Sequence, residues 1–273
     1  MARIKAWEEL TICDNFLFLR VMRNQRLCKR LLEKILCIRI HRISYPVTEK
    51  SIDVRYDSKS VRLDVFVEDD KGTLYDIEMQ TTDNASADEL PKRSRYYQAM
   101  MDMDVLGKGE YYTRLRKSFV IFICTFDPFG QGRSIYTFRE TCKEDPSLCM
   151  GDETTKIFLN SQGSREGIDP DIAAFLDYLN GETAKGLFTQ ELANEVQKVR
   201  EHKETRWEYM TLAMELQRQK MEGHKEGENL FASLVSALLA TGRMEDVERA
   251  AKDEAYRRKL FEEFHLNRKD DVR

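Results

Sequence analysis

Two acidic side chains, Asp64 and Glu78, lie in neighbouring stretches of alternating polar and apolar residues, a pattern typical of β-strands. The stretches cover residues 61–68 and 74–80. Between them, Asp70-Lys71-Gly72 has the composition of a three-residue hairpin loop whose glycine adopts the left-handed conformation. The register of such a hairpin places Asp64 directly opposite Glu78.

This register also separates apolar from polar side chains. One face is wholly apolar and carries the pairs Val67 with Tyr75, Val65 with Ile77, and Leu63 with Met79. The other face carries Asp64 opposite Glu78 and Arg62 opposite Gln80. Because side chains alternate with a period of two, a slip of one residue would mix the two sets.

Like charges placed opposite each other across a hairpin are destabilising, so the pair calls for an explanation. Carboxylate oxygens are preferred ligands of Mg²⁺ and Mn²⁺, which leave their remaining positions to water and phosphate oxygens. The functional interpretation is a metal site that cleaves phosphodiesters. The alternative is an ordinary hairpin whose polar face meets water.

A series of motifs follows the hairpin in a fixed order. The segments are 93–98 (RSRYYQ), 106–112 (LGKGEYY), 120–130 (VIFICTFDPFG), 135–138 (IYTF) and 157–160 (IFLN). Together with Asp64 and the Glu78-x-Gln80 motif, this series resembles the recombination-promoting nuclease / putative transposase family of the PD-(D/E)XK nuclease superfamily. The resemblance covers roughly residues 10–180.

The resemblance implies a Mg²⁺-dependent DNA endonuclease, with Mn²⁺ able to substitute, linked to recombination or mobile DNA. It makes Asp64 and Glu78 the metal ligands and places Gln80 where the superfamily usually has a lysine that orients the attacking water. In the segment that resembles the family's opening helix, Asp14 is implied to lie near the metal. A phosphate contact from that helix falls to Arg20.

Basic residues after the hairpin are candidates for DNA binding. The helix that follows Glu78-x-Gln80 must lie beside the metal if the fold is right, so Arg93, Arg95 and Gln98 are expected to face a DNA groove. The alternative is a solvated charged face.

The composition is that of a globular chain, with 273 residues of which 41% are hydrophobic. A net charge of −4 provides no overall positive field, so any DNA contact must depend on a local groove and a bound metal. The amino terminus has no apolar core of signal-peptide length. The apolar stretches near 119–126 and 230–240 are too short to span a bilayer. We therefore expect a cytoplasmic protein with no membrane partner.

Periodicity and capping residues predict the order of the remaining elements. Helices are expected at 14–22, 24–37, about 92–106 and 169–181, and strands at 40–47, 119–126, 134–138 and 156–160. The run 119–126 has the character of a buried parallel strand. We predict an α/β, restriction-endonuclease-like mixed sheet flanked by helices, forming a nuclease-like domain of residues 1–185.

Residues 186–273 are predicted to form a helical C-terminal extension. Its apolar residues Trp207, Met210, Met214 and Met221 recur at spacings typical of a short coiled-coil seam. A helix break is expected at Gly223 and Gly227. The seam either packs on the nuclease-like domain or joins two chains in a homodimer. The alternative function is correspondingly a catalytically weak module that binds DNA or self-associates through these helices.

Overall fold

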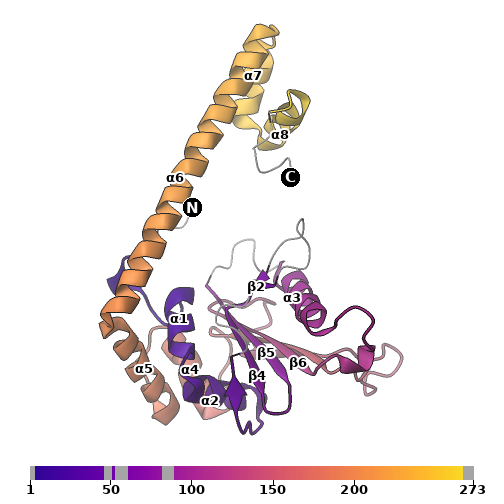
Figure 1. Cartoon of the computed structure of the whole chain (residues 1–273), viewed down its shortest axis with the longest axis vertical. Coiled ribbons are helices and arrows are strands. Elements are labelled where there is room, and N and C mark those ends of the chain that lie inside the picture. Colours follow the sequence, from indigo (N-terminus) through magenta and orange to yellow (C-terminus); the bar gives the residue numbers. More distant parts are fainter. Residues whose placement is uncertain (1–3, 46–50, 53–60, 82–88, 267–273) are drawn as a thin grey trace. The chain divides into compact units, whose positions relative to one another are not determined.

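The computed structural model describes residues 4–45, 51–52, 61–81 and 89–266 (Figure 1). The chain divides into two compact units, Lys5–Arg206 and a second built mainly of Trp207–Arg273. Within the described residues, no helix has both the length and the apolar character needed to cross a membrane. The end of the predicted strand at 46–47 lies outside the described residues. The domain boundary at residue 185 stays a prediction.

The first two helices form where capping and periodicity predict them. α1 covers Asn15–Met22 and α2 covers Gln25–Leu36. Asn24 caps α2 by accepting a hydrogen bond from the Leu27 amide at 3.3 Å. The predicted inward residues Leu27, Leu31, Leu32 and Ile35 are all buried.

The predicted hairpin is present with the expected loop. β4 (Val65–Asp69) pairs antiparallel with β5 (Leu74–Gln80), in a register that includes Val65 with Ile77. Gly72 has φ of +78°, and the Asp69 amide donates to the Thr73 carbonyl at 3.0 Å. The predicted turn and register are therefore confirmed for the paired residues of these strands.

Within the described residues, six strands form one mixed sheet in the order β1-β4-β5-β6-β8-β7. The strands beyond the hairpin are β1 (Ile43–Ser44), β6 (Ser118–Cys124), β7 (Ile135–Phe138) and β8 (Thr154–Asn160). β5, β6 and β8 are parallel, and β1 and β7 pair antiparallel at the two edges. Parallel neighbours need a crossover, and α3 (Leu90–Val105) lies between β5 and β6 in the chain. β2 (Ser51–Ile52) and β3 (Val61–Arg62) form a separate two-stranded sheet.

The two faces of the sheet are covered by different helices (Figure 1). α3 covers an apolar cluster that includes Phe66, Tyr97, Phe122 and Phe158. Away from α3, helix α1 contacts β5, α2 and α5 (Gly186–Glu201), and α2 and α5 in turn pack against α4 (Pro170–Leu179). The sheet is therefore buried on both faces, as its parallel centre requires.

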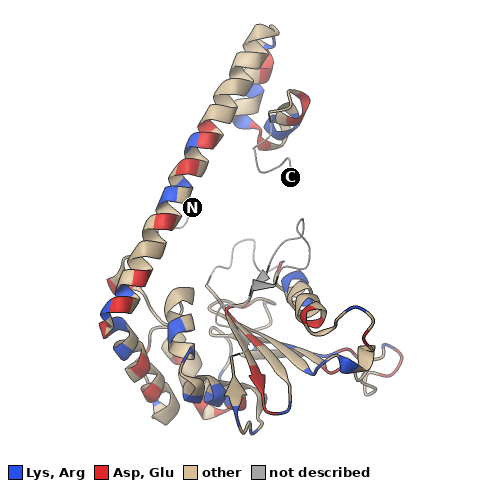
Figure 2. Cartoon of the chain, in the orientation of Figure 1, with Lys and Arg blue, Asp and Glu red and all other residues tan. Residues whose placement is uncertain are grey.

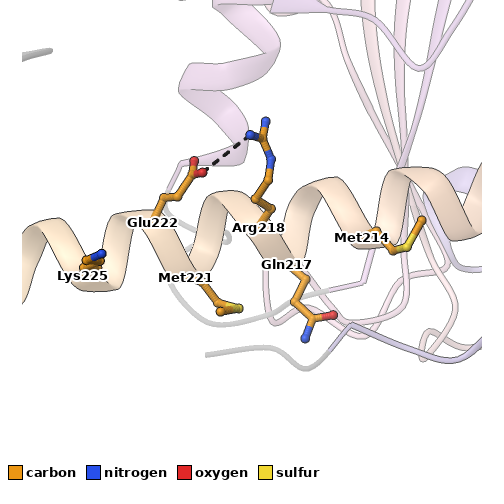
Figure 3. Close-up of a pocket in the computed structure, with 6 residues that line it drawn as sticks. All are labelled: Met214, Gln217, Arg218, Met221, Glu222 and Lys225. Atoms are coloured by element: carbon orange, nitrogen blue, oxygen red, sulfur yellow. Dashed lines mark ion pairs between the residues drawn. The ribbon is translucent and has the colours of Figure 1, made fainter.

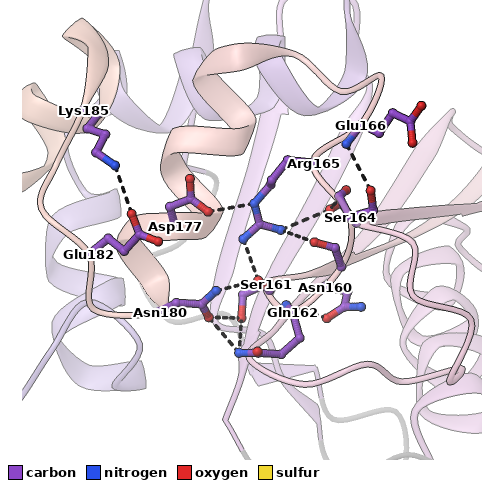
Figure 4. A network of polar contacts seen from close by, with 12 residues as sticks. Asn160, Ser161, Gln162, Ser164, Arg165, Glu166, Asp177, Asn180, Glu182 and Lys185 are labelled. Carbon is purple, nitrogen blue, oxygen red and sulfur yellow. Dashed lines mark hydrogen bonds and ion pairs between the residues drawn. The ribbon is translucent and has the colours of Figure 1, made fainter.

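One partly buried arginine, Arg165, fastens α4 to the end of β8 (Figure 4). Arg165 Nε donates to Asp177 Oδ1 at 2.8 Å, and its Nη2 donates to the Ser161 carbonyl at 2.7 Å. A third bond runs from Nη1 to the Gly163 carbonyl at 2.6 Å. Because a guanidinium binds several acceptors in fixed geometry, this network holds the loop after β8 in one shape.

The second unit contains most of a long helix, α6 (Lys203–Ala240), followed by α7 (Met244–Lys252) and α8 (Glu254–Glu263). α6 runs without interruption through Gly223 and Gly227, so the predicted break there is wrong. A glycine inside a helix costs only about 1 kcal/mol relative to alanine, which a continuous helix can absorb. The break lies instead at His202, where the backbone is extended with ψ of 114°.

The first half of α6 exposes large apolar side chains. Trp207, Met214 and Met221 are 69%, 60% and 66% exposed. Met214 and Met221 line a surface pocket with Gln217, Arg218, Glu222 and Lys225, all from α6 (Figure 3). Acidic and basic residues alternate along the same helix (Figure 2). At the far end, Leu234 and Leu238 are buried against α7 and α8.

Gly163 permits a close approach of two backbone segments. A Cβ at this position would lie 2.4 Å from the Arg133 carbonyl carbon and 2.4 Å from the Ser134 nitrogen. We expect Gly163→Ala to destabilise the first unit by more than about 2 kcal/mol, because backbone must move. Gly72→Ala is the matched control. Its own positive φ is strained, at about 1 kcal/mol, and the added Cβ would meet only Glu68 Oε1, at an ordinary contact distance of 3.9 Å. Equal losses in urea unfolding would contradict the close approach.

Candidate active site

Asp64 and Glu78 do meet, but not as a regular cross-strand pair. The β4–β5 ladder ends at Val65 with Ile77, and the chain bends at Asp64. The Asp64 backbone amide donates to Glu78 Oε1 at 2.9 Å. The expectation that the ladder continues through Leu63 with Met79 is wrong, because this bend intervenes and places Leu63 in the apolar cluster under α3.

The carboxylate of Glu78 is buried rather than solvated. Glu78 is only 1% exposed and Gln80 7% exposed. Both point to the face of the sheet that α3 covers, since Glu78 pairs with Phe122 of the apolar cluster. The alternative of a polar hairpin face in water is therefore wrong.

A third carboxylate, Asp76, was missed by the sequence reasoning. Asp76 is 0% exposed, pairs with Phe66 of β4, and lies two residues from Glu78 on the same face of β5. Its two carboxylate oxygens receive no hydrogen bond from any donor in the described part of the chain. The period of two that selected Glu78 and Gln80 also selects Asp76, so this signal was available.

Burial sets the protonation of these carboxyls. Desolvation, followed by the negative charge of Asp64, raises the pKa of Glu78 from 4.5 to about 8. Desolvation and the neighbouring Glu78 and Asp64 raise the pKa of Asp76 well above its ordinary value. The attraction of Arg93 opposes both shifts without cancelling them. An Asp76 that keeps its proton can share it with Glu78.

Arg93 reaches the two carboxyl-end residues of β5 from α3. Its Nη1 donates to Gln80 Oε1 at 3.0 Å, and its Nη2 lies 3.3 Å from Glu78 Oε2. Its Nε donates to the Tyr97 hydroxyl at 2.8 Å. The structure thus brings together four of the predicted site residues, Asp64, Glu78, Gln80 and Arg93.

The other predicted site residues lie in different surroundings. Asp14 accepts hydrogen bonds from the Thr11 amide at 2.8 Å and from Lys5 Nζ at 2.7 Å. The Arg20 guanidinium lies 5.1 Å from the Phe16 ring centroid on α1. Their roles at a metal or a phosphate stay predictions.

Arg95 and Gln98 differ although both lie on α3. Arg95 is exposed, whereas Gln98 is only 6% exposed. The Gln98 amide donates to Ser118 Oγ at 2.7 Å and to Asp102 Oδ1 at 3.1 Å, which fastens α3 to the start of β6. DNA contact by either residue stays a prediction.

The donor set fits a hard divalent cation. Asp64, Asp76 and Glu78 supply carboxylate oxygens, the ligand type that Mg²⁺ prefers, and the Asp76 oxygens are buried without hydrogen-bond donors. Buried negative charge at this density is stabilised by a cation. The described residues nevertheless contain no group of three or more His, Cys, Asp or Glu side chains already arranged to hold a metal ion.

A mixed six-stranded sheet flanked by helices, with acidic side chains at the end of a central strand, is a restriction-endonuclease-like fold. Residues 16–142 match the family model described as PD-(D/E)XK nuclease family transposase, so the resemblance drawn from the sequence is confirmed over this segment. The match includes Asp64, Asp76, Glu78, Gln80 and Arg93, whereas Asp14 lies just before it. Neither a curated protein nor a solved structure matches the chain.

In metal-free buffer, the free energy of unfolding should fall as the pH rises from about 5 to 8. The pKa of Glu78 is raised in the folded state, so folding holds a proton that the unfolded chain has already lost, and stability present at low pH disappears as pH rises. The slope from one such group is at most about 1.4 kcal/mol per pH unit. Glu78→Gln should reduce this slope in urea unfolding.

The matched control is Glu68→Gln on β4, where the side chain is 30% exposed. This variant should keep the wild-type slope, because Glu78 is still present. If Glu78→Gln also kept the wild-type slope, Glu78 would not be the carboxyl that holds a proton in the folded state.

Proposed function

We propose that the protein is a metal-dependent DNA endonuclease that hydrolyses phosphodiester bonds, in recombination or the movement of mobile DNA. The observation that supports this most strongly is the buried Glu78 carboxylate, joined to Asp64 and to Arg93 at the end of β5. Buried, perturbed carboxyls at one site are costly to a fold and are a feature of catalytic centres. The match to a nuclease family supports the same conclusion.

Asp64 and Glu78 would hold Mg²⁺, with Mn²⁺ as a substitute. When bound, such an ion supplies a Lewis acid for the phosphate and acidifies water at neutral pH. The protein's own contribution is positional. The β5 backbone holds Glu78 and Gln80 rigidly between paired strands, and the apolar cluster under α3 keeps the Glu78 carboxylate out of bulk water.

Each remaining predicted residue has a role in this proposal. Gln80 orients the attacking water, and Arg93 and Arg95 on α3 face the DNA backbone with Arg20 on α1. Gln98 supports α3, and Asp14 is an additional candidate for the metal. Residues 1–185 form the nuclease-like domain in this proposal, residues 186–273 its helical extension, and the protein acts on DNA in the cytoplasm.

Asp64→Asn and Glu78→Gln should each abolish nicking of supercoiled plasmid in Mg²⁺ or Mn²⁺, a loss of at least about a hundredfold. Each change keeps the shape of the side chain and removes its charge, so circular dichroism should be unchanged. Metal binding gives a readout without DNA: Mn²⁺ at 100 times its dissociation constant should stabilise the wild type by about 2.7 kcal/mol. Both variants should lose most of this gain.

Glu68→Gln serves again as the control, since it changes a partly exposed carboxylate on the adjacent strand. It should nick and bind Mn²⁺ like the wild type. Wild-type cutting by Asp64→Asn would exclude the proposed site, and unchanged Mn²⁺ stabilisation in both variants would place the ion elsewhere.

The C-terminal helices are a second candidate for function, as a self-associating module. The observation that favours it is the exposed stripe of Trp207, Met214 and Met221 on α6, because exposed apolar residues at coiled-coil spacing are suited to a partner helix. A homodimer through these helices stays a prediction.

Met214→Glu combined with Met221→Glu should convert a dimer into a monomer in light scattering, because two charges would face the seam of the partner chain. Glu208→Gln and Glu226→Gln on the same helix are controls that leave the stripe intact. A wild-type protein of monomer mass at all concentrations would exclude the homodimer.

A further inference from the structure

Arg93 contacts three side chains in and beside the site, Tyr97, Gln80 and Glu78. We propose that Arg93 is a positioning residue for Gln80. Arg93 binds the carbonyl oxygen of the Gln80 amide, so that Gln80 presents only its NH₂ group to the substrate. Arg93 also supplies the positive charge that a lysine at position 80 would carry. This inference deepens the proposed nuclease function and rests on it.

The orientation of the Gln80 amide follows from the chemistry of its partner. A guanidinium has five N–H donors and no acceptor, so only the carbonyl oxygen of an amide can face it. Arg93 Nη1 lies 3.0 Å from Gln80 Oε1. Gln80 Nε2, on the other side of the amide, therefore points away from Arg93.

This orientation matters for the proposed reaction. A lysine at the position of Gln80 would offer only donors, to the attacking water or to a phosphate oxygen. A freely rotating glutamine could offer either its oxygen or its nitrogen. With the oxygen held by Arg93, Gln80 offers donors alone, as lysine does.

Arg93 is itself held in place by aromatic side chains. Its guanidinium carbon lies 5.1 Å from the Tyr97 ring centroid and 5.8 Å from the Phe122 ring centroid. Nε donates to the Tyr97 hydroxyl at 2.8 Å. These contacts fix the plane of the guanidinium against the wall of the apolar cluster.

The remaining donors of Arg93 leave room for substrate. Contacts to Tyr97, Gln80 and Glu78 use one N–H each, which leaves two. The side chain is 38% exposed. A phosphate oxygen that binds at Gln80 would therefore also lie close to the positive charge of Arg93, which contacts the same amide.

The pairing makes a prediction about lysine that the motif alone does not. Gln80→Lys would place a second cation against Arg93, at roughly hydrogen-bond distance, and like charges this close repel. The single variant should melt at a lower temperature than the wild type and cut more slowly. Gln80→Lys with Arg93→Gln should recover both properties, because the cation then comes from position 80 and the amide from position 93.

The test is a double-mutant cycle of Gln80→Lys and Arg93→Gln in the full-length protein. Melting temperature is measured without metal, and kcat and KM for plasmid nicking are measured in Mn²⁺. Arg93→Gln alone should lower kcat about a hundredfold with KM changed less than about threefold. Arg93→Lys, which keeps the charge but not the planar fork, should retain part of kcat. Lys92→Gln is the control, since it removes an exposed cation from the first turn of the same helix, at a position outside the proposed site.

The two readouts separate the possible failures. Melting temperatures that are additive across the cycle would overturn the pairing of Arg93 with Gln80, whatever the activity. Wild-type kcat in Arg93→Gln would overturn its positioning role. A wild-type protein that never cuts DNA would refute the proposed nuclease function and with it the catalytic role of Arg93. The melting temperatures would then still test whether Arg93 and Gln80 are in contact.

Discussion

The placement of charged side chains on the apolar, α3-covered face of β5 is the constraint on which the candidate site depends. Phe66 and Phe122 flank Asp76 and Glu78 in the strand register, so these carboxyls share a surface with the main apolar cluster. Removing a carboxylate from water is costly unless a cation or a hydrogen bond replaces the water. Arg93 and the Asp64 backbone amide, which the bend at Asp64 turns toward Glu78, each reduce this cost by contacting the Glu78 carboxylate. A divalent ion held by these carboxylates would reduce it further.

Polar side chains of α3 also help to fix the position of this helix on the sheet. Its polar residues do not all face solvent: Gln98 reaches Ser118 at the start of β6, and Arg93 reaches Gln80 at the end of β5. These two contacts lie at opposite ends of adjacent parallel strands. They add polar contacts to the apolar packing that Leu90, Met100 and Met101 of α3 make with the same cluster.

Much of the fold could be predicted from local sequence signals. Gly72 and its neighbours determine the hairpin register, Asn24 begins α2, and the apolar run near 119–126 contains the buried strand β6. The pairing of Asp64 with Glu78 was predicted, but its geometry was not, because the bend at Asp64 has no neighbouring glycine or proline to mark it. The sequence interpretation also placed Arg93 among the DNA contacts. Its bond to Gln80 depends on how far α3 lies from β5, a distance that no local pattern encodes.

At Gly223 and Gly227 the sequence predicted a helix break that the structure does not have. Composition favoured a break, whereas helical residues on both sides carry α6 through, because the loss at two glycines is small against the cooperative hydrogen bonding of a long helix. Asp76 was overlooked for a different reason. It has no charged partner directly opposite in the hairpin, so only the side-chain period of β5 identifies it.

Asp64, Glu78, Gln80 and Arg93 come from a single contiguous part of the chain, the hairpin and the start of the helix that follows. Contacts between residues near in sequence close small loops and form early in folding. The candidate site residues would therefore meet when α3 docks on β5, whatever the state of β7 and β8. Insertions in the loops beyond β6 would change how firmly the site is supported, but not which side chains meet in it. Such a site can remain intact while the rest of the domain diverges.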